Sequence, residues 1–232
     1  MNYQRRKLVV FFIEIKHRKK RLMNRKKHWE KVFGTKKATE VSWYQPKPQD
    51  SLDFISQFNL PKTASIIDIG CGDSFLVDNL LDLGYTDITV LDISATAIEK
   101  VKERLGEKAS LVKWVVSDIL NFTTEKKYDC WHDRAAFHFL TTQNEVDKYL
   151  EIAQGHITAS GKMVIGTFST EGPKKCSGLP VKQYDEKMLA GSLQKWFKKI
   201  RCINTNHITP FKTIQNFLFC SFQKQQYNYG HS

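Results

Sequence analysis

Apolar and polar residues alternate along the chain in blocks that predict strands separated by helices. Five short apolar runs have the length and composition of buried strands: 65–69, 88–91, 111–116, 128–132 and 162–168. Apolar residues spaced three or four apart predict helices in the gaps: 74–83, 95–105, 143–156 and 185–198. Single helices between successive strands are typical of a doubly wound, mostly parallel sheet.

Two flanking regions complete the predicted fold. Strand-like runs at 200–204 and 216–222 predict a C-terminal antiparallel hairpin. The expected fold is therefore α/β and Rossmann-like, with a doubly wound, mostly parallel seven-stranded sheet. Before the first strand, one short amphipathic helix is expected over 28–33 and another beginning near residue 50. Prolines in the segment between these helices forbid regular structure there.

The positive charge is concentrated at the N-terminus. The chain has 232 residues and a net charge of +12. Residues 1–27 contain eleven basic residues and one acid, Glu14, and so carry +10 of that charge. The remainder is almost neutral, which argues against a charged cleft for nucleic acid. We therefore divide the chain into a basic N-terminal extension (1–27), one domain (28–223) and a short tail (224–232).

Three interpretations of this extension stay open. It is a solvated basic arm that contacts nucleic acid or a membrane surface weakly, or a mitochondrial transit peptide, or a segment removed because translation starts at Met23. The absence of serine from residues 1–27 counts against a transit peptide. The longest apolar run, Leu8 to Ile13, has six residues, too few for a transmembrane segment.

Cysteine usage bears on the compartment. The chain has five cysteines, an odd number, and no C-x-x-C pair. This pattern argues against a disulfide scaffold and against a structural zinc ribbon. We therefore expect a reducing compartment and a cytoplasmic protein.

A glycine-containing turn follows the first strand. The chain reads Asp68-Ile69-Gly70-Cys71-Gly72, and two glycines let the backbone approach a ligand at the start of a helix. The spacing of a dinucleotide-binding motif would require a third glycine where Phe75 stands. Because the charge of Asp68 would repel a pyrophosphate, the turn favours a cationic ligand such as S-adenosylmethionine, which carries an ammonium and a sulfonium.

Two further acids follow the next two strands. Asp92 ends the second strand, where a carboxylate can accept hydrogen bonds from both ribose hydroxyls. Asp118 follows the third strand and can accept from an adenine amino group, while Ile119 packs on the ring. Ligands of doubly wound sheets bind at the carboxyl ends of the strands, so the three acids are expected to converge on one nucleoside.

These motifs resemble the class I, seven-strand S-adenosylmethionine-dependent methyltransferases over about residues 27–223. The resemblance implies a Rossmann-like fold, S-adenosylmethionine as cofactor and methyl transfer to a nucleophilic nitrogen or sulfur. It also implies cofactor contacts from the glycine turn and the strand ends: Asp68, Gly70, Gly72, Asp92, Ile93, Asp118 and Ile119.

A narrower set of motifs resembles the branch that contains lysine methyltransferases of elongation factor 1A and citrate synthase. The residues that carry this resemblance are His28-Trp29-Glu30, Phe33, Trp43-Tyr44 and Asp133-Arg134-Ala135. It implies a protein lysine as the acceptor and places Arg134 at the cofactor. The aromatic residues Trp29, Phe33, Trp43 and Tyr44 are expected either to cover the cofactor or to hold the N-terminal helix on the sheet as a hydrophobic staple. Phe33 replaces a tyrosine of that branch, and Arg134-Ala135 replaces a Lys-Gly pair.

Two other functional classes stay open beside this one. Thiopurine and other small-thiol methyltransferases carry a similar Asp-Arg element, so a small-molecule acceptor is an alternative. A non-catalytic module that binds nucleic acid or a membrane through its basic arm is a second. A nicotinamide-dependent reductase is a weaker third.

The exit of the fourth strand is expected to face the methyl group. His132 is the candidate general base because its ordinary pKa lies near neutrality, and Asp133 is expected to attract a lysine ammonium. Asp133, His132 and His138 lack the spacing of a metal site, so no metal is expected. The chain contains no Pro-Pro and no Pro-Cys pair, which argues against the motif used on planar nitrogens and against covalent cytosine chemistry.

Overall fold

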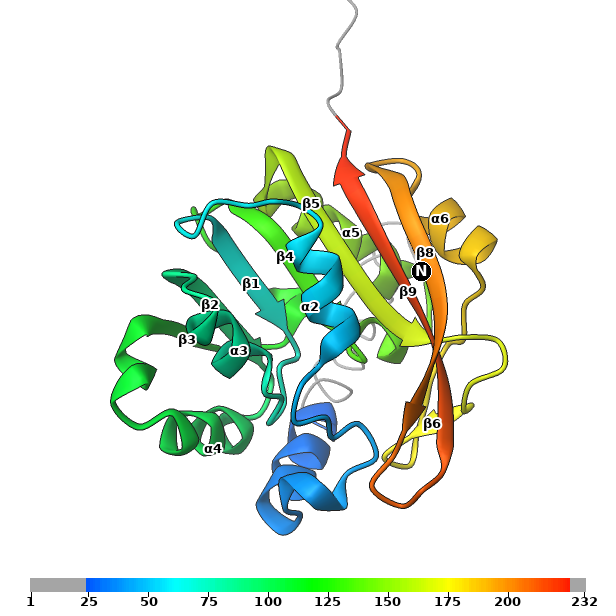
Figure 1. Cartoon of the computed structure of the whole chain (residues 1–232). Helices are drawn as coiled ribbons and strands as arrows, with labels where there is room; N and C mark the ends of the chain where they lie inside the picture. The colour runs from blue at the N-terminus through cyan, green and yellow to red at the C-terminus, as the bar shows by residue number, and fades with distance from the viewer. Residues whose placement is uncertain (1–23, 226–232) are drawn as a thin grey trace, which may run out of the picture.

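A computed structural model describes residues 24–225 of the chain. Seven strands form one sheet in the order β3-β2-β1-β4-β5-β9-β8 (Figure 1). The first five are parallel: β1 (Ser65–Ile69), β2 (Asp87–Asp92), β3 (Val112–Val116), β4 (Tyr128–Arg134) and β5 (Ile157–Phe168). The last two, β8 (Phe197–Ile208) and β9 (Ile214–Lys224), form an antiparallel hairpin whose second strand pairs with β5. The predicted fold class is confirmed.

Helices cover both faces of this sheet. The described helices are a segment over 24–35, α2 (Gln49–Ser56), α3 (Leu76–Asp82), α4 (Ala95–Leu105), α5 (Gln143–His156) and α6 (Glu186–Leu193). Short 3-10 turns connect them: η1 (Ala38–Glu40), η2 (Gly106–Leu111), η3 (Ile119–Asn121) and η4 (Phe137–Phe139). Two hydrophobic clusters result. One packs α2, α3 and α4 on one face, and the other packs α5 and α6 on the opposite face.

Local sequence explains where several helices begin and end. The Ser94 hydroxyl accepts a hydrogen bond from the Ala97 N–H and so caps α4, which ends at Gly106 with a φ of 56°. Thr142 and Glu145 form a reciprocal capping box at the start of α5. The predicted bounds of these two helices, 95–105 and 143–156, match the structure.

The C-terminal part departs from the predicted boundaries. The helix expected to reach residue 198 ends at Leu193, because Phe197 already pairs with Lys224 as the first residue of β8. The terminal hairpin is accordingly longer than its predicted strands. A small pair of strands, β6 (Lys175–Cys176) and β7 (Leu179–Pro180), lies in the segment between β5 and α6 and has no counterpart in the predicted elements.

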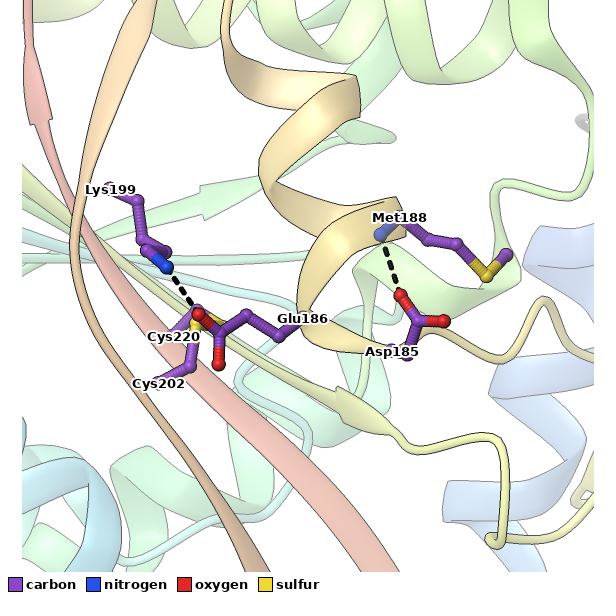
Figure 2. The surroundings of a disulfide bond; sticks show 6 residues. All are labelled: Asp185, Glu186, Met188, Lys199, Cys202 and Cys220. Carbon is purple, nitrogen blue, oxygen red and sulfur yellow. Dashed lines mark hydrogen bonds and ion pairs between the residues drawn. A yellow bond between two sulfur atoms is a disulfide. The ribbon is translucent and has the colours of Figure 1, made fainter.

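A disulfide joins Cys202 of β8 to Cys220 of β9, which lie directly opposite each other in the hairpin (Figure 2). The expectation from cysteine usage is therefore wrong for this pair. The odd count arises because Cys71, Cys130 and Cys176 are free and buried. Near the disulfide, Lys199 of β8 forms an ion pair with Glu186 at the start of α6.

Most of the predicted basic extension (1–27) and of the predicted tail (224–232) lies outside the described residues. The interpretations of residues 1–23 therefore stay predictions. Within residues 24–225, no helix has the length and apolar character needed to cross a membrane.

Candidate active site

A cavity lies at the carboxyl ends of β1, β2 and β4 and beside the turn after β3. The residues that the sequence predicted to contact the cofactor all line it: Trp29, Phe33, Trp43, Asp68, Gly70, Gly72, Asp92, Ile93, Asp118, Ile119 and Arg134. His132 also lines the cavity, whereas Asp133 does not.

The glycine turn is shaped for close approach. Gly70 and Gly72 have φ values of +63° and +54°, a region that side chains rarely adopt. A Cβ at Gly70 would lie 2.5 Å from the Ala136 Cβ, and one at Gly72 would lie 3.0 Å from the Phe33 ring. Both positions therefore require glycine, and the backbone itself forms this wall of the cavity.

Asp92 fixes the turn and also faces the cavity. Its two carboxylate oxygens accept hydrogen bonds from the Gly72 and Ser94 N–H groups, each at 2.8 Å. Burial raises the pKa of Asp92 to about 6, although these two hydrogen bonds oppose the shift. The carboxylate is therefore ionised at neutral pH and retains lone pairs for further donors.

Asp118 already has a cationic partner. Its Oδ1 accepts from the Leu120 N–H at 2.8 Å, and its Oδ2 lies 3.1 Å from Nη2 of Arg25. Arg25 also lies 3.5 Å from Glu145 and lines the cavity. Sequence reasoning missed Arg25 because it assigned this residue to the basic extension; only the helical spacing of Arg25 and Trp29, four residues apart, places both on one face.

Asp68 is joined to His132 and Ser51 in a buried row. Asp68 Oδ1 lies 2.7 Å from His132 Nδ1, and His132 Nε2 lies 2.9 Å from the Ser51 hydroxyl. His132 is 2% exposed. Both ring nitrogens are thus engaged, so the ring has no free lone pair for a substrate proton in this arrangement. This geometry disfavours the predicted role of His132 as a general base.

Asp133 holds the turn after β4. Its Oδ1 accepts from the Ala136 and Phe137 N–H groups at 3.1 and 2.9 Å, and its Oδ2 accepts from the Tyr149 hydroxyl at 2.8 Å. Burial raises the pKa of this carboxyl to about 6, against the effect of those hydrogen bonds. Because it is fully buried and does not reach the cavity, Asp133 is not placed to attract a substrate ammonium, in contrast to its predicted role.

Arg134 connects the cavity to the loop that precedes α2. Its guanidinium donates to Gln45 Oε1 at 2.7 Å and to the Trp43 carbonyl oxygen at 2.9 Å. Burial lowers the pKa of Arg134, while nearby carboxylates, among them Asp68, oppose that shift. The arginine remains charged and holds the loop against the end of β4.

Aromatic rings form a wall of the cavity beside the glycine turn. Trp29 lies 5.8 Å from Phe33, 6.0 Å from Trp43 and 5.2 Å from Phe139, measured between ring centroids. Aromatic faces attract cations such as a sulfonium or an ammonium. The predicted aromatic group therefore assembles at the cavity, and Phe139 is a further member.

Glu30 attaches the N-terminal helix to the rest of the site. Its carboxylate accepts hydrogen bonds from the Ser94 hydroxyl and from the Ala95 and Thr96 N–H groups, at 2.8 to 3.1 Å. Burial alone would raise the pKa of Glu30, but these hydrogen bonds and the Thr96 hydroxyl outweigh it and lower the pKa to about 2. An acid at the start of α4 also suits the helix dipole.

The cysteines near the cavity are poor nucleophiles. Cys71 and Cys176 both line it, yet burial raises the pKa of each thiol, that of Cys176 to about 12. Since the thiolate is the reactive form, neither is activated for covalent chemistry.

Comparison with known proteins gives a consistent picture. Residues 66–161 match the protein family described as "Methyltransferase domain". The chain is 27% identical over 168 residues to the mouse "eEF1A lysine and N-terminal methyltransferase", a match that covers 62% of this chain and 23% of that protein. It is 30% identical over 139 residues to "Malonyl-[acyl-carrier protein] O-methyltransferase 1" of Ilyobacter polytropus, which covers 60% of this chain and 50% of that protein.

Solved structures share the fold at lower identity. The N-methyltransferase NodS of Bradyrhizobium japonicum, solved with S-adenosylhomocysteine, has a TM-score of 0.64 at 14% identity, and the match covers 86% of this chain and all of that one. A 1,6-didemethyltoxoflavin N1-methyltransferase of Burkholderia thailandensis, also solved with S-adenosylhomocysteine, has a TM-score of 0.62 at 18% identity over 84% and 81% of the two chains. The chain spans between a quarter and a half of the length of the curated relatives above.

Proposed function

We propose that this chain, a class I methyltransferase by its fold and family match, transfers the methyl group of S-adenosylmethionine to a nucleophilic acceptor. The observation that carries the proposal is the convergence of Asp68, Asp92 and Asp118 on one cavity beside the glycine turn. These acids are far apart in the sequence and come from three different strand ends. A single cationic nucleoside explains why the fold brings them together.

The residues of the cavity fit this cofactor. Asp92 is ionised at neutral pH and suits the two ribose hydroxyls, and Asp118 with Ile119 suits the adenine ring. Asp68 and the aromatic wall suit the positive charges. Gly70 and Gly72 have no room for a Cβ because Ala136 and the Phe33 ring lie against them, and their backbone lines the cavity.

When bound, S-adenosylmethionine supplies a methyl group on a positively charged sulfur. The protein contributes positioning and exclusion of water. Arg134 holds the loop containing Trp43 against β4, and Glu30 holds the helix containing Trp29 against α4, so the two aromatic elements close the cavity from one side. With both nitrogens of His132 engaged, we propose that the acceptor loses its proton to water before transfer.

We propose a protein lysine as the acceptor. The two relatives described above are named for acceptors that are part of a protein or attached to one. One name refers to a lysine and the N-terminus of elongation factor 1A, and the other refers to a malonyl group on acyl-carrier protein. The resemblance of the His28-Trp29-Glu30 and Trp43-Tyr44 elements to lysine methyltransferases supports the first of these. A lysine acceptor is compatible with a site that has no free catalytic base, because under this proposal its amine loses its proton to water before the methyl transfer.

A small-molecule acceptor is the second candidate. The neighbouring structures include a methyltransferase whose title names 1,6-didemethyltoxoflavin as a bound ligand. The enclosing aromatic rings of Trp29, Trp43 and Phe139 would also suit a compact apolar substrate. Under this alternative, label from the cofactor would leave with low-molecular-weight material.

The test uses purified protein and S-adenosylmethionine labelled in its methyl group. Binding is measured first, by calorimetry with S-adenosylhomocysteine. Label transfer is then measured with purified elongation factor 1A, with malonyl-loaded acyl-carrier protein and with a dialysed cell lysate, each between pH 7 and 9. Mass spectrometry identifies the labelled atom.

A methylated lysine, formed faster as the pH rises, supports the proposal, because an unprotonated amine becomes more abundant toward its ordinary pKa. Label that appears only in small molecules supports the second candidate. Failure to bind S-adenosylhomocysteine would overturn the assignment of the cavity itself.

A further inference from the structure

The hairpin of β8 and β9 carries an exposed apolar tip beside the cavity. Ile208, Phe211 and Ile214 have exposed fractions of 69%, 58% and 65%. Ile208 and Ile214 are opposite each other in the strand register, and Phe211 lies in the turn between them. We call these three exposed apolar residues at the end of the hairpin the hairpin tip. Exposed apolar patches of this kind mark interaction sites.

The hairpin tip extends past the edge of the main sheet. Strand pairing between β5 and β9 ends at Phe168 and Phe217, and beyond it the Ser169 N–H still donates to the Asn216 carbonyl oxygen at 3.1 Å. Residues 214 and 215 pair with β8. Figure 1 shows the end of this hairpin near β6, at the same end of the molecule as the carboxyl ends of β1 and β5. The tip therefore projects where an acceptor must approach.

Polar side chains keep the turn rigid. The Thr209 N–H donates to the Thr213 carbonyl oxygen at 2.9 Å, and the two threonine hydroxyls lie 2.7 Å apart. The Phe211 N–H donates to the Thr209 hydroxyl at 3.2 Å. Because this network holds the backbone of the turn, the three apolar side chains stay directed toward solvent rather than folding back onto the sheet.

A chain of hydrogen bonds connects the hairpin to the cavity. His207 Nε2 lies 2.7 Å from the Ser42 carbonyl oxygen, and its Nδ1 lies 3.2 Å from Gln45 Nε2. Gln45 accepts in turn from Arg134, which lines the cavity. The hairpin tip is thus fixed relative to the site by a buried polar row and not by a flexible tether.

The surroundings of the tip are basic. Three segments border it or the cavity: 34–48, 169–184 and 207–215. Together they contain seven lysines, two glutamates and no aspartate or arginine. Lys212 lies in the turn itself, and the acid Asp50, just beyond 34–48, accepts a hydrogen bond from the Thr205 side chain of the hairpin. The excess of lysines in these segments attracts an acidic partner.

From these observations we infer that the hairpin tip and its lysines dock a folded acceptor protein with an apolar contact ringed by carboxylates. The inference rests on the proposed methyltransferase function and specifies its acceptor as protein-borne. Protein is favoured over nucleic acid because two of the three apolar side chains are isoleucines, which do not stack on bases, and because residues 207–215 contain no arginine. It is favoured over a membrane because the named acceptors of the relatives are carried by proteins.

The test compares a triple-substituted protein, the tip variant, with a double-substituted control. The tip variant carries Ile208→Ser, Phe211→Ser and Ile214→Ser. The control carries Leu83→Ser and Leu111→Ser, which are also exposed, at 48% and 60%, but precede β2 and β3 at the opposite end of the sheet. The probe is methyl-labelled S-adenosylmethionine with a dialysed, nuclease-treated lysate, at several lysate dilutions and salt concentrations. Calorimetry with S-adenosylhomocysteine and co-sedimentation with phosphatidylcholine–phosphatidylserine vesicles accompany it.

We expect the tip variant to label its protein band at least tenfold more slowly at high dilution, while the control and the affinity for S-adenosylhomocysteine stay unchanged. Added salt should slow wild-type labelling. Equal rates in the tip variant and wild type would overturn the docking inference. The inference would also be overturned if the wild type labelled only small molecules, or if labelling required intact nucleic acid. It would likewise be overturned if the tip variant lost vesicle binding but labelled protein normally. Loss of S-adenosylhomocysteine binding by the wild type would instead overturn the proposed function.

Discussion

The two sides of the cavity are built in different ways. On the cofactor side, Asp68, Asp92 and Asp118 each lie at a strand end or within two residues of one. A second group of contacts, which we call the acceptor side, joins distant parts of the chain and includes Trp43 and Arg134, two of the predicted cofactor contacts. Arg134 holds Trp43 across 91 positions, and His207 holds Ser42 across 165. One side follows from local pattern and topology, whereas the other depends on tertiary contacts.

This difference predicts how the two sides respond to change. The cofactor side has few independent parts, since the Asp92 carboxylate holds the glycine turn and also faces the ligand. The acceptor side is a set of separate attachments, the guanidinium of Arg134 and the His207 hydrogen bonds, and the disulfide lies farther along the same hairpin. Substitutions on the cofactor side should abolish cofactor binding. Substitutions on the acceptor side should lower stability or acceptor turnover and leave the affinity for the cofactor unchanged.

The largest expected effect tests the cofactor side. Asp92→Ala removes a buried carboxylate proposed to accept two ribose hydroxyls, and each hydrogen bond to a charged group contributes about 1.5–3 kcal/mol. We expect the Kd for S-adenosylhomocysteine to rise about a thousandfold by calorimetry. Asp68→Ala should weaken binding in the same direction.

Asp82→Ala is the matched control, because Asp82 is an exposed aspartate paired with Lys108 at the surface. Its affinity should equal that of wild type. Since Asp92→Ala also leaves two N–H groups unpaired, thermal unfolding of the variant should be recorded. A folded Asp92→Ala protein that binds normally would contradict the assignment of the ribose site.

The next effect tests the acceptor side. The Cys202–Cys220 disulfide closes a loop with a sequence separation of 18. Loop-closure entropy for that length corresponds to about 3 kcal/mol of stability. We expect dithiothreitol to lower the free energy of unfolding in urea by about this amount while cofactor affinity stays constant. A Cys202→Ala, Cys220→Ala protein should not respond to dithiothreitol, and an equal response would contradict the explanation.

Sequence reasoning succeeded where function follows from position at a strand end. The five parallel strands and the hairpin were predicted, and the eleven predicted cofactor contacts line one cavity. It failed where a role depends on neighbours brought by the fold. The ring of His132 looks like a free base in the sequence, but Ser51 and Asp68 occupy it. Nothing local to Glu30 indicates that it caps a helix some 65 residues later.

The disulfide shows the same limit. Cys202 and Cys220 share no motif, and only the register of β8 against β9 places them opposite each other. A shift of one residue along either strand would move one sulfur to the other face of the sheet. Pairing of this kind becomes predictable only when the register is known.

A smaller effect concerns pH and separates binding from folding. Burial raises the pKa of Asp92 to about 6, above its ordinary 3.8. Ligand hydroxyls need the ionised carboxylate, so the affinity for S-adenosylhomocysteine should fall below about pH 6, by up to tenfold per pH unit. Folding responds with the opposite sign. A raised pKa means that the native state favours the proton, so the contribution of Asp92 to stability is present at low pH and is lost as the pH rises through 6.

Calorimetry and urea unfolding between pH 5 and 8 measure both quantities. Asp92→Asn, which cannot ionise, should bind weakly and without this pH dependence. If affinity in the wild type is constant between pH 5 and 7, Asp92 does not contact the ligand. Glu30 has a lowered pKa of about 2, so the stability that its carboxylate contributes to the protein is lost only at pH values below this range.

The smallest effect is expected at Ala135, where the two sides of the cavity meet. Its φ is +65°, a conformation that costs a residue with a Cβ about 1 kcal/mol, whereas glycine adopts it freely. The branch of methyltransferases that this chain resembles has glycine at the corresponding position. Ala135→Gly should relieve that strain but add entropy to the unfolded chain, for a net gain of about 0.5 kcal/mol in urea unfolding. Ala136→Gly, at a φ of −107°, has no such strain to relieve and should lose stability instead, so a gain in both variants would show that the left-handed backbone of Ala135 is not the cause.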